Sequence, residues 1–124
     1  MILLDTNYLI RALVEGTLEA DHVRNWITAG EDLCTSSIAW YELLCGPVDE
    51  AGVELVGAIV NYRIIPYTTD HAMESARFFN STGRKRRLRV DSMVVAAAIV
   101  RNAQLETDKV QDFGEFLPQS LKMV

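Results

Sequence analysis

The sequence predicts an α/β fold, built as a single domain over residues 1–124 around a central, mostly parallel sheet. Short apolar runs typical of strands alternate with longer segments of helical spacing. Strands that alternate with helices form βαβ units, whose strands are parallel. A chain of 124 residues, 49% hydrophobic and 23% charged, is long enough for one hydrophobic core and has the composition of a globular protein.

Five segments have the character of strands. The first three are apolar runs bounded by polar residues, and the last two are weaker. They are residues 2–5, 32–37, 63–67, 103–107 and 120–124.

The segments between them show helical spacing and end signals. They are residues 17–30, 37–47, 50–62, 70–83 and 90–102. The segment 90–102 has no polar face in its middle and is compatible with either a buried strand or a buried helix. Its length and its three consecutive alanines favour a buried helix.

The first apolar run ends on Asp5, which is followed by Thr6 and Asn7. Open α/β sheets bind ligands at the carboxyl edge of their strands, so Asp5 is a candidate functional residue. It could equally cap a helix that starts near Asn7. This stretch alone leaves both interpretations open.

Further acids occur at comparable places. Glu42 lies among apolar residues of the 37–47 helix, Asp91 opens the 90–102 helix, and Asp108 and Asp112 follow the 103–107 strand. Each alone has a structural interpretation as a cap, a turn residue or a solvated side chain.

In a parallel sheet these places meet at one edge. Clustered carboxylates repel each other unless a cation compensates. Oxygen ligands without His or Cys suit Mg²⁺ or Mn²⁺, and such ions serve phosphoryl chemistry.

Four stretches carry a resemblance to a known family: "LLDTNYLI", "SSIAWYELLCG", "LRVDSMVVAAAIV" and "TDKVQDF". In order and approximate spacing they resemble the PIN-domain family, most of all its VapC-type toxins, the ribonuclease components of type II toxin–antitoxin pairs. The resemblance implies a three-layer sandwich with a five-stranded parallel sheet. It also implies a Mg²⁺-dependent endoribonuclease that cleaves RNA, forms a homodimer and has a small antitoxin protein as partner.

The resemblance assigns the first three catalytic acids to Asp5, Glu42 and Asp91, with Asp5 and Asp91 as metal ligands. The fourth is either Asp108 or Asp112, because Thr107 is followed directly by Asp108 where the family often has an intervening residue. Thr6 and Asn7 are expected to orient the first carboxylate.

The negative net charge argues against tight nonspecific binding of nucleic acid, so the distribution of the basic residues matters more than their number. The chain has a net charge of −5, yet five of its twelve Lys and Arg residues lie within residues 84–89. We call residues 84–87 the basic segment; it consists of Arg84, Lys85, Arg86 and Arg87. It would hold the RNA backbone beside the acids, whereas the alternatives are a solvated loop or a contact with an acidic antitoxin tail.

Other features bear on location and on rival functions. The absence of a membrane-length apolar run and of a signal-peptide pattern predicts a cytoplasmic protein, in which Cys34 and Cys45 are buried free thiols. A haloacid-dehalogenase-type phosphatase would need a second Asp where Asn7 stands. The other rival is a non-catalytic binding module with a PIN-like fold.

Overall fold

The structure is a computed structural model that describes residues 1–108, 110–114 and 121–124. Its centre is a five-stranded sheet with the order β3-β2-β1-β4-β5, in which every pairing between described strands is parallel. The strands are β1 (Ile2–Leu4), β2 (Leu33–Ser36), β3 (Ile64–Ile65), β4 (Gln104–Glu106) and β5 (Lys122–Met123). All five predicted strands are therefore present, each shorter than expected.

The predicted helices are also present, with ends that differ by at most three residues. The helical elements are α1 (Thr6–Ala12), α2 (Leu18–Thr28), α3 (Ser37–Cys45), α4 (Glu50–Ile59), α5 (Thr69–Ser81), the 3₁₀ helix η1 (Arg86–Leu88), α6 (Arg89–Val100) and α7 (Val110–Gly114). The largest difference is at the end of α4. That helix stops early because Asn61 and Tyr62 adopt positive φ angles of 51° and 52°, which no α-helix accommodates.

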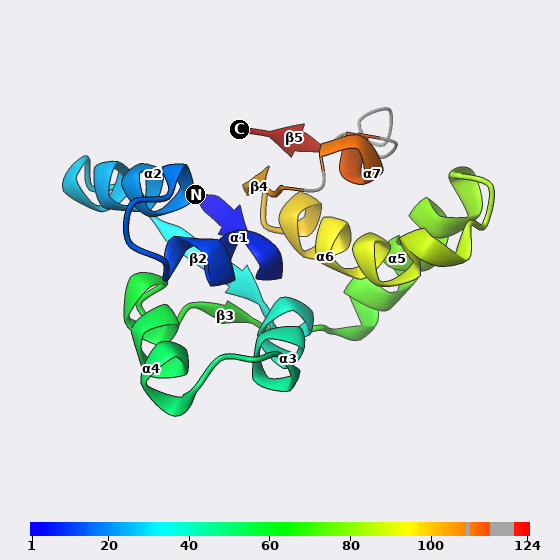
Figure 1. The fold of residues 1–124 in the computed structure, drawn as a ribbon. Coiled ribbons are helices and arrows are strands. Elements are labelled where there is room, and N and C mark those ends of the chain that lie inside the picture. Colours follow the sequence, from blue (N-terminus) through cyan, green and yellow to red (C-terminus); the bar gives the residue numbers. More distant parts are fainter. Residues whose placement is uncertain (109, 115–120) are drawn as a thin grey trace.

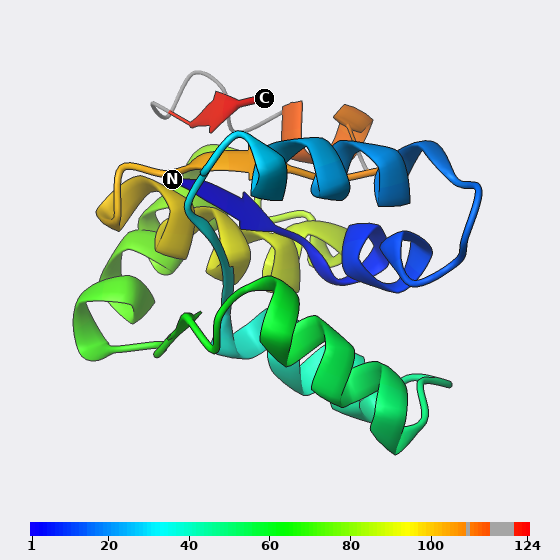
Figure 2. The ribbon, with the colours of Figure 1, turned by 90° about the vertical axis from the view of Figure 1, so that its left-hand side faces the viewer.

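The elements form three layers, with the sheet in the middle (Figures 1 and 2). Alternate residues of β1 point to opposite faces of the sheet. Leu3 packs into a core shared with α5, α6 and α7, whereas Ile2 and Leu4 pack into a second core with α1, α2 and α4. This arrangement confirms the predicted three-layer α/β sandwich.

Helix α6 is the most deeply buried helix of the described chain. Five consecutive residues, Val94–Ala98, are at most 1% exposed, so the apolar segment is a buried helix and not a strand. Burial of each valine side chain contributes roughly 1.5–3 kcal/mol. This packing holds α6 against the sheet and fixes where its first turn lies.

The chain reverses its direction of winding at β1. From β1 it proceeds to β2 and β3 on one side, and β4 then pairs with β1 on the other side. In open α/β sheets the crevice outside such a switch point, at the carboxyl ends of the strands, is the usual ligand site. The backbone N–H of Asp5 donates to the carbonyl of Glu106 at 3.1 Å, so β1 and β4 end side by side there.

The two cysteines differ in their environment. Cys34 lies in β2 with no exposure, and its burial raises the pKa of the thiol to about 11. Cys45 is exposed, so the prediction of two buried thiols is wrong for this residue. The reason is its position on the last turn of α3, where its neighbour Leu44 is also 54% exposed.

Among the described helices, none combines the length and the apolar character that a membrane crossing requires.

Candidate active site

Asp5 is a buried carboxylate at the carboxyl end of β1. It occupies the N-cap position of α1, but its side chain makes no capping hydrogen bond, so the interpretation as a mere cap is wrong. Its side chain is 2% exposed, and its Oδ2 accepts a hydrogen bond of 3.0 Å from the hydroxyl of Thr107. A buried carboxylate is costly unless it is paired or hydrogen-bonded, so this position is specifically supported by the end of β4.

Glu42 is joined to the same edge through Thr6. The Thr6 hydroxyl lies 3.2 Å from Oε1 of Glu42 and 3.1 Å from the carbonyl of Ala39, so its single proton is shared between the two acceptors. The first residue of α1 therefore connects to α3. We expected Thr6 and Asn7 to orient the first carboxylate, whereas Thr6 contacts the second carboxylate and Asn7 is exposed.

Asp91 lies in the first turn of α6. The N-cap of this helix is Leu88, so Asp91 is the third helical residue and not its cap. It is 5% exposed. Because α6 leads back into parallel strand β4, the helix runs antiparallel to the strands and begins on the side of their carboxyl ends. The topology thus places Asp91 toward the same edge as Asp5.

Asp108 directly follows Thr107 and is an exposed residue whose side chain is 32% exposed. Its Oδ2 lies 3.6 Å from Nε of Arg11, and the negative charge of Glu19 also acts on its carboxyl group. Burial, followed by the charge of Glu19, raises the pKa of Asp108, and the charge of Asp5 acts in the same direction. Asp5 and Asp108 are therefore close enough to repel each other.

Asp112 lies in α7, which agrees with the expectation that "KVQDF" begins a helical turn. Its side chain, however, lies outside the part of the structure that is described. The choice between Asp108 and Asp112 as the fourth acid thus stays a prediction, with contacts known for Asp108 only.

The donor chemistry of this edge fits a hard divalent cation. Asp5 and Asp91 supply buried carboxylate oxygens, and Mg²⁺ typically uses one or two carboxylates and keeps several waters. Within the described side chains, however, no three Asp, Glu, His or Cys residues form a ready ligand set. Asp5 and Asp91 are therefore the two residues that would hold such an ion.

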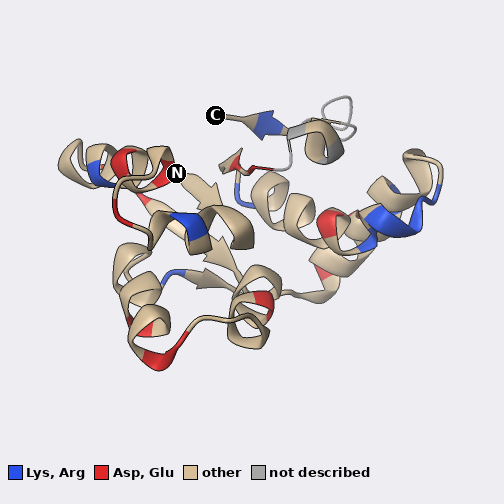
Figure 3. Cartoon of the chain, in the orientation of Figure 1, with Lys and Arg blue, Asp and Glu red and all other residues tan. Residues whose placement is uncertain are grey.

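The basic segment directly precedes α6. All four of its side chains are exposed, and Arg86 and Arg87 belong to η1. Figure 3 shows blue positions gathered where α5 joins α6. The positive charge therefore lies on the segment that leads into α6, the helix that carries Asp91. Exposure of these side chains is compatible both with RNA binding and with a solvated loop.

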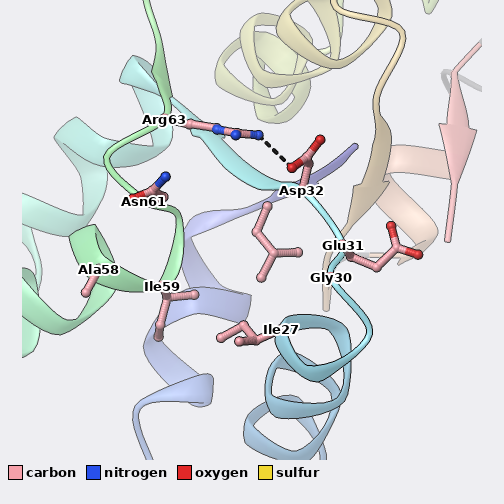
Figure 4. A pocket seen from close by; sticks show the side chains of 9 residues that line it. Ile27, Gly30, Glu31, Asp32, Ala58, Ile59, Asn61 and Arg63 are labelled. Atoms are coloured by element: carbon pink, nitrogen blue, oxygen red, sulfur yellow. Dashed lines mark ion pairs between the residues drawn. The ribbon is translucent and has the colours of Figure 1, made fainter.

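A well-formed pocket of about 280 Å³ lies elsewhere, between the ends of α2 and α4 (Figure 4). Asp32 and Arg63 line it and form an ion pair of 2.9 Å. Both residues directly precede strands, β2 and β3, so the pocket lies at the amino edge of the sheet. None of the candidate acids contributes to it.

Sequence reasoning missed three residues of the candidate site: Thr107, Arg11 and Glu19. Thr107 was noted only as a motif position, yet it donates to Asp5. Glu19 follows the Thr17 cap of α2, and acidic residues are common there because they favour the helix N-terminus. The one available signal was that Arg11 is the only basic residue of the first sixteen.

Comparison with known proteins places the chain in a family. The family model that matches is described as "PIN domain", and it matches residues 2–110. Among proteins with curated descriptions, none matches the sequence significantly.

Several solved structures share the fold. A chain of a toxin–antitoxin complex from Klebsiella pneumoniae is 23% identical, with 91% of this chain and 90% of that chain covered and a TM-score of 0.70. A chain of VapBC2 from Rickettsia felis, bound to a DNA fragment from its promoter, is 18% identical, with coverage of 100% and 98% and a TM-score of 0.72. VapC20 from Mycobacterium tuberculosis, described as a sarcin-ricin loop cleaving toxin, is 12% identical, with coverage of 92% and 94% and a TM-score of 0.66.

Proposed function

The chain belongs to the PIN-domain family, and from that premise we propose that it is a Mg²⁺-dependent endoribonuclease and the toxin of a type II toxin–antitoxin pair. The observation that carries the proposal is the buried carboxylate of Asp5. It lies at the β1/β4 switch point and is supported by the hydroxyl of Thr107 at 3.0 Å. A buried carboxylate is costly to the fold, and the carboxyl edge of an open α/β sheet is where such folds bind ligands.

In the proposed reaction, Asp5 and Asp91 hold Mg²⁺, or Mn²⁺ in its place, and Glu42 with Asp108 or Asp112 completes the acidic group. The bound ion supplies Lewis acidity, which makes water a better nucleophile and offsets charge on the phosphate. The hydroxyls of Thr107 and Thr6 orient the carboxylates of Asp5 and Glu42.

RNA is the proposed substrate, and the basic segment is its proposed backbone contact. The acidic edge repels a polyanion, so binding needs positive charge nearby. The basic segment supplies four exposed cationic side chains immediately before α6.

A small antitoxin is the proposed protein partner. The support comes from similar folds that were solved in complexes described as toxin–antitoxin pairs. Expression of the chain should stop bacterial growth, and co-expression of its antitoxin should restore it. We also propose a homodimer, to be checked by sedimentation equilibrium.

The rival function is a non-catalytic binding module. The observation that favours it is the lack of a ready three-carboxylate ligand set among the described side chains. An active enzyme must bring its acids together around the ion, whereas a binding module need not.

The deciding experiment measures cleavage of a labelled RNA by the purified protein with Mg²⁺ and with EDTA. Glu42→Gln should abolish the Mg²⁺-dependent cleavage. Glu54→Gln, which alters an exposed carboxylate of α4, is the matched control and should cleave like the parent. Cleavage that survives EDTA, or that is equal in both variants, would overturn the proposed reaction. A complete lack of cleavage by the folded parent would favour the binding module.

A further inference from the structure

Three charged side chains from different elements meet beside the candidate site. Arg11 at the end of α1 donates from Nε to Oε1 of Glu19 at 2.9 Å, and the same Nε lies 3.6 Å from Oδ2 of Asp108. The Nε of Arg11 is thus shared by the carboxylates of Glu19 and Asp108, whose like charges oppose each other. We call these residues the Arg11–Glu19–Asp108 cluster.

The members of this cluster differ in burial, because the Arg11 side chain is 61% exposed whereas Glu19 is buried. Glu19 is 9% exposed, whereas the other acid of the first turn of α2, Asp21, is exposed. A buried glutamate is unfavourable without a partner. Its partner here is Arg11, whose Nε also lies 3.6 Å from Asp108 after β4, so Arg11 links α1 and α2 to the loop that leaves the sheet.

The cluster is connected to Asp5 through a single residue. Asp108 is the neighbour of Thr107, and Thr107 donates to Asp5. The charge of Asp5 acts on Asp108 in the same direction as that of Glu19, whereas the charge of Arg11 opposes both. Arg11 therefore supplies part of the positive charge that a cation would otherwise supply to these acids.

We propose that Arg11 and Glu19 are positioning residues that set the affinity of the acidic edge for its divalent cation. Arg11 offsets the negative charge of Asp108. Glu19 binds Arg11 at the shorter distance and so weakens that compensation. This inference rests on the proposed function. It assigns to two residues outside the four acids opposite effects on the affinity for the ion.

The opposite signs follow from electrostatics. Removal of the Arg11 charge leaves Asp108 and Asp5 less compensated, so a cation binds more tightly. Removal of the Glu19 charge leaves Arg11 fully available to Asp108, so a cation binds more weakly. For charges at this separation and partial exposure, each effect on the dissociation constant is roughly three- to tenfold at about 0.1 M salt. A purely structural role would change both variants in the same direction.

The test is the affinity for Mg²⁺ without RNA, measured as the rise in melting temperature over a Mg²⁺ titration. Arg11→Gln should lower the dissociation constant, Glu19→Gln should raise it, and Arg11→Lys, which keeps the charge, should stay near the parent. Arg24→Gln removes the same charge from a 70% exposed side chain of α2 and is the matched control, expected to leave the affinity unchanged. The melting temperature without Mg²⁺ reports whether each variant folds.

Two different failures are distinguishable. If the parent binds Mg²⁺ and Asp5→Asn does not, the proposed ion site stands. Equal or same-direction effects of Arg11→Gln and Glu19→Gln would then overturn only the positioning roles. If the folded parent shows no Mg²⁺-dependent stabilisation, the proposed function and this inference fall together.

Discussion

Replacement of Asp5 by Asn removes one negative charge without a change of shape, from a side chain that is 2% exposed. The hydroxyl of Thr107 can still donate to the Asn oxygen. A hydrogen bond to a charged acceptor contributes about 1.5–3 kcal/mol, whereas one between neutral groups contributes about 0.5–1.5 kcal/mol. The substitution therefore costs about 1 kcal/mol at this bond.

A second effect opposes this cost. Asp5 and Asp108 repel each other, and the substitution relieves that repulsion in the metal-free protein. We expect the two effects to cancel to within about 1 kcal/mol. Asp5→Asn should therefore fold normally without metal, and the variant can even be slightly more stable than the parent.

The difference should appear when Mg²⁺ is added. At a concentration about one hundred times its dissociation constant, a ligand stabilises the folded protein by about 2.7 kcal/mol. For a chain of 124 residues this corresponds to a rise in melting temperature of about 10 °C. Asp5→Asn should lose most of this rise and all Mg²⁺-dependent RNA cleavage, and Asp91→Asn should do the same.

Thermal unfolding with and without Mg²⁺, together with an RNA cleavage assay, measures both effects on the same samples. Asp21→Asn changes an exposed acid of α2 and serves as the control for a general loss of negative charge. A folded Asp5→Asn variant that keeps the full Mg²⁺ shift and full cleavage would refute the assignment of Asp5 as a metal ligand.

Three further predictions concern other residues. Replacement of residues 84–87 by Ser should weaken RNA binding. The slope of the logarithm of the RNA-binding constant against the logarithm of the salt concentration should become shallower by about 0.7 for each phosphate that the variant no longer neutralises. An unchanged slope would mean that the segment is a solvated loop. Asp108→Asn should reduce cleavage more than Asp112→Asn over a Mg²⁺ titration, because Asp108 lies directly after Thr107, and a reversed order would contradict this. His71 is 3% exposed, and burial, aided by the charge of Arg101, lowers its pKa from 6.5. Stability should therefore be full above about pH 6.5 and fall below it, as melting curves from about pH 8 to pH 5 will show, with a smaller fall in His71→Gln.

The fold was largely predictable from local sequence. Apolar runs, caps and helical spacing are properties of neighbouring residues, so they report each element without knowledge of the others. The ends of elements were less predictable because they depend on backbone conformation, as the positive φ angles of Asn61 and Tyr62 show at the end of α4. Exposure of Cys45 depended on what packs against α3, which the sequence does not state.

The candidate site was predictable in its acids but not in their partners. An isolated carboxylate among apolar residues, such as Asp5, stands out in a sequence. Its partner Thr107 is 102 residues away, and the partner of Glu42 is Thr6, 36 residues away. Such pairs depend on which strands and helices become neighbours, and a single Thr or Arg gives no local sign of this.

The register between β1 and β4 couples the fold to the site. Leu4 pairs with Glu106 in the parallel ladder, so Asp5 and Thr107 are the next residues in the same register. Neighbouring strands lie about 4.8 Å apart, which brings the Thr107 hydroxyl within hydrogen-bonding distance of Asp5. A slip of one residue would turn every side chain of one strand to the opposite face and bury Glu106 or Asp108 beside Asp5 instead. Because Leu3 and Leu105 on one face of the sheet and Leu4 on the other have no exposure, the apolar packing on both faces resists that slip. The hydrophobic core therefore selects which polar residue meets the first carboxylate.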